Sequence, residues 1–322
     1  MTSPSNSSAE VPSSAASFAA KARDLESLRL AVIDAASVSE NLWFSYIFVL
    51  LYLLIAVGSV THQDLFFEHP VKLPFLNIDL PLMGFFILGP LLFIVIHIYV
   101  LLHFVLLSMK IGAFHVELRE QLSFDDDVRA RLRRQLPSNI FVQFLAGPRE
   151  IRAGIVGHLL TLIAYISLVI GSISLLVFFL IQFLAYHDWR VTWWHRFAVV
   201  IDIVIAWRLW LAVATGKSAS FRGLSATRLI TAGSASLAVI GFIFFVANYP
   251  GEWLNKLPHI RILPTTNSTT SKQFISIYDL LIAGDVDFIS RKATSLWSNR
   301  LVLTNIQATG KEITKDGEGS KL

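Results

Sequence analysis

Long apolar runs with few or no charges dominate the pattern along the chain. Each run is close to or above the roughly 20 residues that an α-helix needs to cross the hydrocarbon core of a bilayer. The pattern predicts an all-α fold, a polytopic transmembrane helical bundle within residues 41–253. Its five expected spans cover approximately residues 42–60, 82–107, 155–185, 197–214 and 229–249.

The segments before and after the bundle are polar. Residues 1–20 are rich in Ser and have little to bury, so we expect a disordered tail that lacks the basic and apolar regions of a signal peptide. Residues 21–40 place apolar side chains such as Leu25 and Leu28 on one face, which predicts a short amphipathic helix. Residues 254–322 predict a polar C-terminal tail without a further span.

The polar middle segment, residues 108–154, predicts a cytoplasmic loop that contains its own helix. Ser123 suits an N-cap, Asp126 follows as in a capping box, and Pro137 ends the helix. Its arginines are candidate contacts for anionic lipid headgroups, but the preference for basic residues in cytoplasmic loops explains them equally well. These arginines are Arg129, Arg131, Arg133 and Arg134.

The fourth apolar run decides the number of spans, because it contains Asp202 and Arg208. Its apolar residues favour insertion by roughly 3 to 6 kcal/mol, whereas each charged residue near a helix centre costs about 2.5 to 3.5 kcal/mol. If this run stayed outside the membrane, the basic loop 215–228 would share a side with the acidic loop 61–81. Five spans instead keep the basic loops and the N-terminus inside, so five is the prediction and four the alternative.

Composition agrees with a membrane protein and excludes several kinds of partner and site. The chain is 54% hydrophobic and 16% charged, whereas soluble domains average about 25% charged residues. The net charge of +4 is explained by basic cytoplasmic loops, so we expect no nucleic-acid partner. The chain has no cysteine, which excludes disulfides, thiolate metal sites and cysteine nucleophiles.

Ionisable residues inside the spans are the candidate site residues. Asp202 and Arg208 lie about 240° apart around one helix, so each needs a partner on another helix or in water. His97 or His158 is a candidate partner for Asp202. His97 and His103 lack the i, i+4 spacing of a two-histidine metal site, so no metal or cofactor is predicted. Two interpretations stay open: a functional polar site, or a structural Asp202 with Arg208 extending to the interface.

Small residues recur at close-packing spacing in the third and fifth runs. Ser167 with Gly171, and Ala232 with Ser236, follow the small-xxx-small pattern that lets helix backbones approach each other. Packing within one bundle and a homo-oligomer interface both explain this pattern.

Three stretches resemble a known family. Residues 41–107 (NLWFSYIFVLLYLLIAVG and onward) resemble the opening of bacterial pentapeptide-repeat membrane proteins, as do ANYPGEWL (247–254) and SLWSNRLVL (295–303). In that family a helical membrane region precedes a right-handed β-helix of A(D/N)LXX repeats, regarded as a protein-interaction scaffold. The resemblance implies a membrane-embedded N-terminal region. No A(D/N)LXX run occurs in this chain, so neither a β-helix nor any functional residue is carried over.

The sequence contains no P-loop, GxGxxG, HExxH or GxSxG motif. We therefore expect a non-enzymatic protein of the bacterial inner membrane, with its N-terminus in the cytoplasm and its C-terminal tail in the periplasm. Its expected role is an anchor or scaffold whose partners are the lipid bilayer, other membrane proteins or a second copy of itself. The alternative is an oligomeric transporter or channel with a polar path through Asp202 and Arg208.

Overall fold

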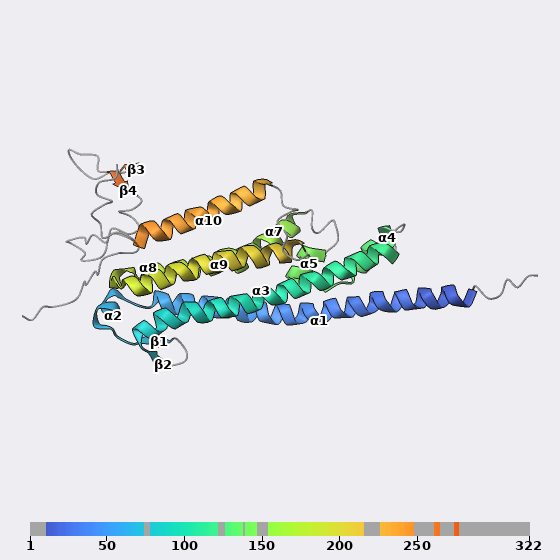
Figure 1. Cartoon of the computed structure of the whole chain (residues 1–322), viewed down its shortest axis with the longest axis horizontal. Helices are drawn as coiled ribbons and strands as arrows, with labels where there is room; N and C mark the ends of the chain where they lie inside the picture. Colours follow the sequence, from blue (N-terminus) through green and yellow to red (C-terminus); the bar gives the residue numbers. More distant parts are fainter. Residues whose placement is uncertain are drawn as a thin grey trace, which may run out of the picture.

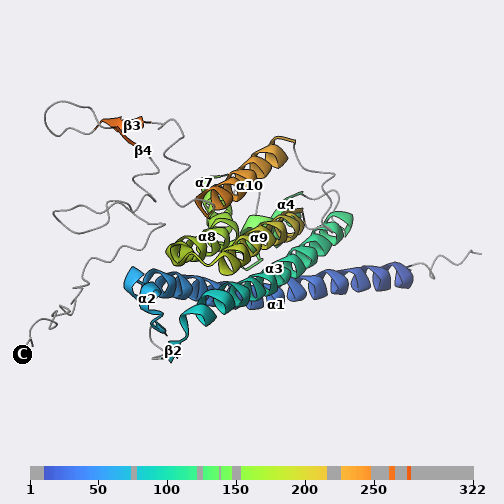
Figure 2. The same ribbon diagram turned by 60° about the vertical axis from the view of Figure 1, so that its left-hand side comes forward.

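The chain folds into a bundle of long helices that lie side by side (Figures 1 and 2). The computed structural model describes residues 11–73, 78–121, 126–137, 139–146, 154–215, 226–247, 261–264 and 274–276. Within these residues the structure is predominantly helical, as the apolar runs predict. Two short pairs of antiparallel strands are additional features that the hydropathy pattern does not predict.

Three stretches of helix in the described part of the chain are long and apolar enough to cross a membrane. The first is Arg23–Gly58, which belongs to α1 (Val11–Gly58), and the second is α3 (Leu82–Gln121). The third, Ile155–Tyr186, is a composite. It joins α7 (Ile155–Tyr165), the π-helical turn η1 (Ile166–Ile170), α8 (Gly171–Phe183) and the 3-10 turn η2 (Leu184–Tyr186).

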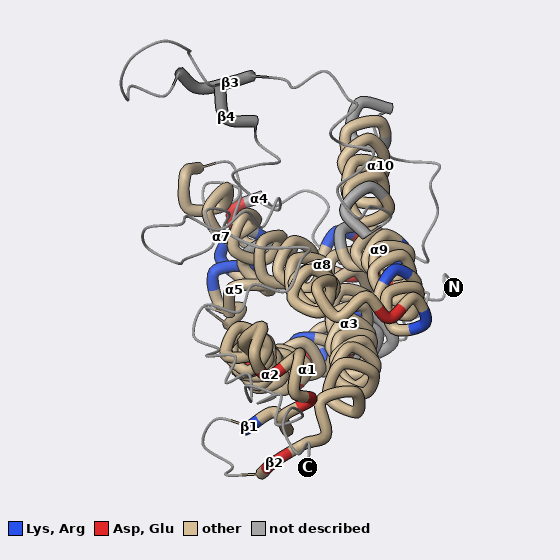
Figure 3. Tube along the Cα trace, turned by 90° about the vertical axis from the view of Figure 1, so that its left-hand side faces the viewer, with Lys and Arg blue, Asp and Glu red and all other residues tan. Residues whose placement is uncertain are grey.

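Two further helices pack on these three. α9 (Trp189–Thr215) lies against α3 and α8, and α10 (Ala226–Ala247) lies against α9 and α8. Figure 3, which views the bundle from one end, shows α10 at its edge beside α9. α10 contains the shorter apolar stretch Ile230–Phe244. α9 carries the charged residues Arg190, Arg196, Asp202 and Arg208 along its length.

α1 differs from the predicted boundaries. It runs without a break from Val11 to Gly58, so residues 11–20 are helical rather than disordered, and the predicted amphipathic helix is continuous with the first span. The alanine-rich start of α1 favours helix, and extending an existing helix avoids the cost of nucleation. At 1.5 Å per residue its 48 residues cover about 72 Å, more than twice the hydrocarbon thickness of about 30 Å.

α3 also continues past its predicted end. It reaches Gln121 rather than stopping near residue 107, so the first part of the predicted loop 108–154 is helical. The later part contains α4 (Asp126–Arg134) and α5 (Ile140–Ala146). The helix predicted to end at Pro137 is therefore present as α4, although Ser123 lies outside the described residues.

The ends of α1 and α3 pack with α4 and α5 into what we call the membrane-proximal extension, consisting of residues 23–41, 108–121, 126–137 and 139–146. Figure 1 shows α1 continuing well beyond the ends of α8 and α9, with α4 at the same end of the molecule. The Asn139 side-chain amide donates to the Ala36 carbonyl and to the Glu40 carboxylate, both at 3.2 Å. The apolar core of the extension includes Val32, Phe114, Leu118, Leu136 and Val142.

The opposite end of the bundle carries compact connections. α2 (His62–Phe67) is followed by β1 (Val71–Leu73) and β2 (Ile78–Leu80), which pair antiparallel. α9 begins at Trp189, about two turns before the predicted start of the fourth span at residue 197. The Asp188 carboxylate accepts from the N–H groups of Arg190 and Val191, at 2.8 and 3.2 Å, and so caps this earlier start. The connection between the third and fourth predicted spans, residues 186–196, is therefore largely helical. In the predicted polar tail, β3 (Arg261–Pro264) pairs with β4 (Phe274–Ser276).

Candidate functional site

The most distinctive polar feature of the bundle is a buried pair formed by His97 of α3 and Asp202 of α9. Both side chains are 0% exposed, and His97 Nδ1 lies 2.6 Å from Asp202 Oδ1. The other ring nitrogen, His97 Nε2, lies 2.9 Å from the backbone carbonyl oxygen of Leu168 in η1. The pair thus connects three elements that are far apart in the sequence. Of the two histidines considered as partners for Asp202, the structure places His97 there.

The π-helical turn η1 explains why a backbone carbonyl is available to His97. A π-turn widens the helix, as seen in the bond from the Gly171 N–H to the Ile166 carbonyl, and this exposes neighbouring carbonyls to other donors. Besides the bond between His97 and Leu168, the Ser167 carbonyl accepts from the Tyr46 hydroxyl at 3.2 Å. Such turns often occur at functional positions in helices.

Tyr46 of α1 completes one wall of the site. Its ring stacks on the His97 ring, with the ring centroids 5.6 Å apart. The Phe93 ring stacks on both, with its centroid 5.9 Å from that of Tyr46 and 6.0 Å from that of His97. Tyr46 is fully buried inside the bundle. An aromatic residue near the start of a span is typical of an interface. The sequence therefore holds no signal that separates Tyr46 from an interfacial aromatic.

The pair is suited to holding a proton rather than to binding a substrate. Solvent does not reach either side chain in this structure, because both are fully buried. A carboxylate and an imidazole at hydrogen-bond distance exchange protons readily, and either group stabilises the charged form of the other. Asp202 Oδ2 has no hydrogen-bond partner among the described residues, which marks this oxygen as the polar atom of the pair that the fold does not satisfy.

A second buried histidine, on α9, donates a hydrogen bond to a backbone carbonyl of α3 that lacks its usual helical donor. Pro90 lies inside α3 and has no N–H to donate to the carbonyl of Phe86, four residues earlier. His195 of α9, which is buried, lies with Nε2 2.8 Å from this carbonyl oxygen and donates to it. The Trp194 indole N–H donates to the next carbonyl, that of Ile87, at 3.0 Å. Sequence analysis did not identify this pairing, although an unpaired carbonyl four residues before a proline is a readable signal.

The structure does not bring the other candidate site residues to the pair. Arg208 is exposed on α9, His158 is exposed on α7, and His103 is half-buried with its ring against Tyr99 at a centroid distance of 4.7 Å. The polar path through Asp202 and Arg208 is therefore not formed by direct contact of these two side chains.

The four candidate lipid-binding arginines all lie on α4 or directly at its end. Arg131 and Arg134 are exposed, whereas Arg129 and Arg133 are half-buried. α4 belongs to the membrane-proximal extension. Their role as lipid contacts stays a prediction.

The two small-residue stripes have different surroundings. A Cβ on Gly171 would lie 3.0 Å from Leu50 of α1, so the third-run stripe serves close packing within the chain. In α10 the Ser236 hydroxyl accepts from the Trp207 indole N–H at 2.9 Å. A Cβ on Gly233 or Gly241 would meet no atom within 4 Å, so packing within the chain does not explain these two glycines.

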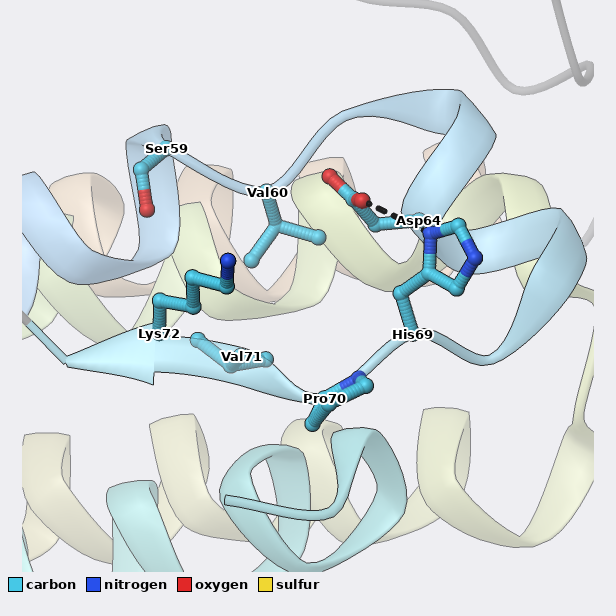
Figure 4. Close-up of a pocket in the computed structure, with 7 residues that line it drawn as sticks. All are labelled: Ser59, Val60, Asp64, His69, Pro70, Val71 and Lys72. Carbon is cyan, nitrogen blue, oxygen red and sulfur yellow. Dashed lines mark hydrogen bonds and ion pairs between the residues drawn. The ribbon is translucent and has the colours of Figure 1, made fainter. Parts of the chain in front are cut away.

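A cleft of about 550 Å³ lies in the connection between α1 and α3, lined by Ser59, Val60, Asp64, His69, Pro70, Val71 and Lys72 (Figure 4). Its acidic group serves local structure. Asp64 accepts from the Thr61 N–H and hydroxyl, at 3.0 and 2.6 Å, and lies 3.3 Å from His69 Nδ1. Partial burial raises the pKa of Asp64, but the bonds from Thr61 and His69 outweigh it and hold the pKa below its ordinary value. We infer that Asp64 caps α2 rather than serving the cleft.

The described residues contain no group of three or more His, Asp or Glu placed to hold a metal ion. The candidate site therefore consists of His97 and Asp202, with Leu168, Ser167 and Tyr46 as supporting groups. Comparison with known proteins finds no matching family model, no matching curated protein and no matching solved structure.

Proposed function

We propose that the chain is a non-enzymatic integral membrane protein of the bacterial inner membrane that anchors and scaffolds a protein assembly. In this proposal five spans cross the bilayer, the N-terminus is cytoplasmic and the C-terminal tail is periplasmic. The family resemblance to the membrane region of pentapeptide-repeat proteins belongs to the same proposal.

The observation that carries the proposal is the continuity of α1 and α3. Both helices pass without a break from an apolar segment into the membrane-proximal extension. There they pack with α4 and α5 around a buried core. The Asn139 side chain, at the start of α5, donates a hydrogen bond to the Ala36 carbonyl of α1. A rigid connection between membrane helices and a folded surface outside them is what an anchor for a partner protein requires. The extension also carries exposed apolar side chains, Leu30 and Val116, at 56 and 58% exposure.

The arrangement of the five apolar segments supports the five-span topology. α1, α3, the α7–α8 composite, α9 and α10 run roughly along one direction (Figures 1 and 2). α2, β1 and the α8–α9 connection lie at one end, and α4 and α5 at the other. The charge of Asp202, which made the fourth span marginal, is buried against His97.

Topology is tested by thiol labelling, because the chain has no cysteine. Ser298→Cys, in the C-terminal tail, is expected to react with a membrane-impermeant reagent on intact spheroplasts. Ser27→Cys is the matched control on the exposed N-terminal part of α1 and is expected to react only after lysis. Labelling of both residues only after lysis would place the tail in the cytoplasm and contradict five spans.

Scaffolding is tested by a photo-cross-linking amino acid placed at exposed Glu120 of the extension, with exposed Leu92 in the apolar part of α3 as control. We expect a discrete protein adduct from Glu120 in cells and none from Leu92. Asn139→Leu, which removes the bonds from α5 to α1, is expected to weaken the adduct. Purification of a monomer together with no adduct at Glu120 would contradict the scaffold function.

The transporter or channel remains the second candidate, and the specific observation in its favour is the buried pair with an unsatisfied carboxylate oxygen. Ionisable groups at this depth often belong to proton relays or ion paths. Flux through reconstituted protein that disappears in Asp202→Asn would establish this function, and unchanged flux would remove Asp202 from any path.

A further inference from the structure

We propose that His97 and Asp202 form a binding site for a single proton inside the bundle, and that this proton holds α9 against α3 and η1. The inference goes beyond scaffolding, because it assigns a ligand to the pair and makes the packing of α9 depend on it. It stands on the geometry of two hydrogen bonds and on the surroundings of the pair.

The hydrogen bonds determine where protons lie. The Leu168 carbonyl oxygen only accepts, so His97 Nε2, at 2.9 Å, carries a proton and donates it. The second contact, 2.6 Å between Nδ1 and Asp202 Oδ1, joins two acceptors unless a proton lies between them. That proton belongs either to an imidazolium facing a carboxylate or to a carboxylic acid facing a neutral imidazole. In both forms the pair binds this one proton and has no net charge.

Burial opposes both the loss and the gain of a proton at this site. Loss leaves an ionised carboxylate facing the lone pair of Nδ1, with both side chains 0% exposed. Gain leaves an imidazolium beside a neutral acid, which is a buried positive charge without a partner. Removing an ion from water without pairing it is much more costly than burying a neutral pair. The one-proton state therefore persists for as long as the helices stay packed.

The neighbouring elements provide few titratable groups that could replace the proton. Tyr46 of α1 stacks on His97, but its hydroxyl donates to the Ser167 carbonyl. Phe93 of α3 covers the ring as well. From α8, the Ser172 hydroxyl donates to the carbonyls of η1. None of these groups supplies a charge at neutral pH.

The charged residues nearest to Asp202 along α9 face other surroundings. Arg196 and Arg208 are each six positions away, about 240° around the helix axis. The Arg196 guanidinium lies 4.8 Å from the ring centroids of both Trp193 and Phe244, and Arg208 is exposed. On the α10 side of α9, the Trp207 indole N–H donates to the neutral Ser236 hydroxyl. The proton between His97 and Asp202 is thus the group that neutralises this carboxyl.

The proposal is tested by the pH dependence of unfolding of the purified full-length chain in mixed micelles. Asp202→Asn retains the size of the side chain, and its amide donates to Nδ1 without a titrating proton. Above about pH 4.5 the unfolded forms of both proteins titrate alike, since an unperturbed Asp has a pKa near 3.9. The folded wild type holds one proton more than the folded variant. We therefore expect the ratio of unfolding constants, wild type over variant, to rise about tenfold per pH unit.

The exposed pair of Asp64 and His69 provides the matched control. For Asp64→Asn we expect the ratio of unfolding constants, wild type over variant, to stay constant over the same pH range. A constant ratio for Asp202→Asn would overturn the proposal, since it would mean that the folded pair holds no extra proton.

Nitrogen NMR of the wild type tests the site without any risk that a variant fails to fold. We expect the His97 signals, assigned by their loss in His97→Gln, to show a protonated Nε2 that does not change between about pH 5 and 8. His97 signals that change over this range, or that lack the Nε2 proton, would overturn the proposal.

Discussion

The described residues include two histidine–aspartate pairs that use the same chemistry in opposite surroundings. His97 and Asp202 lie 2.6 Å apart with 0% exposure and come from two packed helices, at positions 105 residues apart in the sequence. His69 and Asp64 lie 3.3 Å apart with side chains 52 and 34% exposed, in one short connection. The first pair joins α3 to α9, whereas the second closes a turn after α2.

The difference between the pairs shows that surroundings, more than residue type, determine what such a contact contributes. Exposed ion pairs contribute less than about 1 kcal/mol, because water and salt screen the charges. A buried pair is balanced between desolvation and attraction, so the intact pair contributes little net stability, but removal of one partner leaves a costly buried group. We therefore expect four substitutions to separate the two environments, in decreasing order of effect.

The largest effect is expected for His97→Leu, which leaves Asp202 buried without a partner. Breaking a buried pair in this way costs about 3 to 5 kcal/mol, measured as the free energy of unfolding in mixed micelles. The double variant His97→Leu with Asp202→Leu is the control, because an apolar pair has no charge to desolvate. We expect it to recover most of the stability. A double variant as unstable as the single one would show that the lost packing, not the orphaned carboxyl, causes the effect.

The next effect is expected for His195→Leu, where the lost partner is a neutral backbone group. The variant leaves the Phe86 carbonyl without a donor, and an unsatisfied buried polar group costs about 1 to 3 kcal/mol. Pro90→Ala restores a backbone N–H four residues after Phe86, so His195→Leu should cost less in that background. This double-mutant cycle isolates the pairing. Equal costs in both backgrounds would show that His195 does not act through this carbonyl.

A smaller effect is expected for Tyr46→Phe, which retains the aromatic ring against His97 and removes the hydroxyl bond to the Ser167 carbonyl. Net contributions of single hydrogen bonds are about 0.5 to 1.5 kcal/mol. The loss of stability is measured in the same unfolding assay. Tyr52→Phe, a change of the same chemistry on a half-buried residue of α1, is the control and should have less effect. A larger loss for Tyr52→Phe would contradict the assignment.

The sequence predicts the class and approximate positions of the helices well, because hydrophobic periodicity and length are local properties. The apolar segments near residues 82–107 and 155–185 lie within described helices, and α10 covers the fifth segment as far as Ala247. The boundaries fail where helices continue into polar sequence. α3 continues to Gln121 because the membrane-proximal extension packs its polar end. α1 begins at Val11 because its alanine-rich start extends an existing helix. Hydropathy registers neither effect.

The candidate site was predictable only in part. Asp202 is conspicuous because a carboxyl inside an apolar run requires a partner, and His97 was one of two histidines considered for it. The register that brings residues 97 and 202 together depends on how α3 and α9 pack. Leu168 enters through its backbone carbonyl, and the π-helical turn that presents it has no composition signal. Such features arise from tertiary packing and require the structure.

The smallest effect is expected at the exposed pair, where Asp64→Asn removes the carboxylate that caps α2 and faces His69. Screening limits the loss to less than about 1 kcal/mol, so local hydrogen exchange at the Leu65 amide, which donates to the Thr61 carbonyl at 3.1 Å, is the sensitive measurement. The pKa of Asp64 is lowered in the folded chain. Its contribution is therefore complete above the ordinary pKa of Asp and disappears as pH falls through the lowered value. Wild-type protection at Leu65 should decrease toward acid, and Asp64→Asn should show no such decrease. If the wild type and Asp64→Asn lose protection at Leu65 equally toward acid, a group other than Asp64 controls the stability of this connection. The two histidine–aspartate pairs would then differ in burial but not in a demonstrated contribution of the exposed carboxylate.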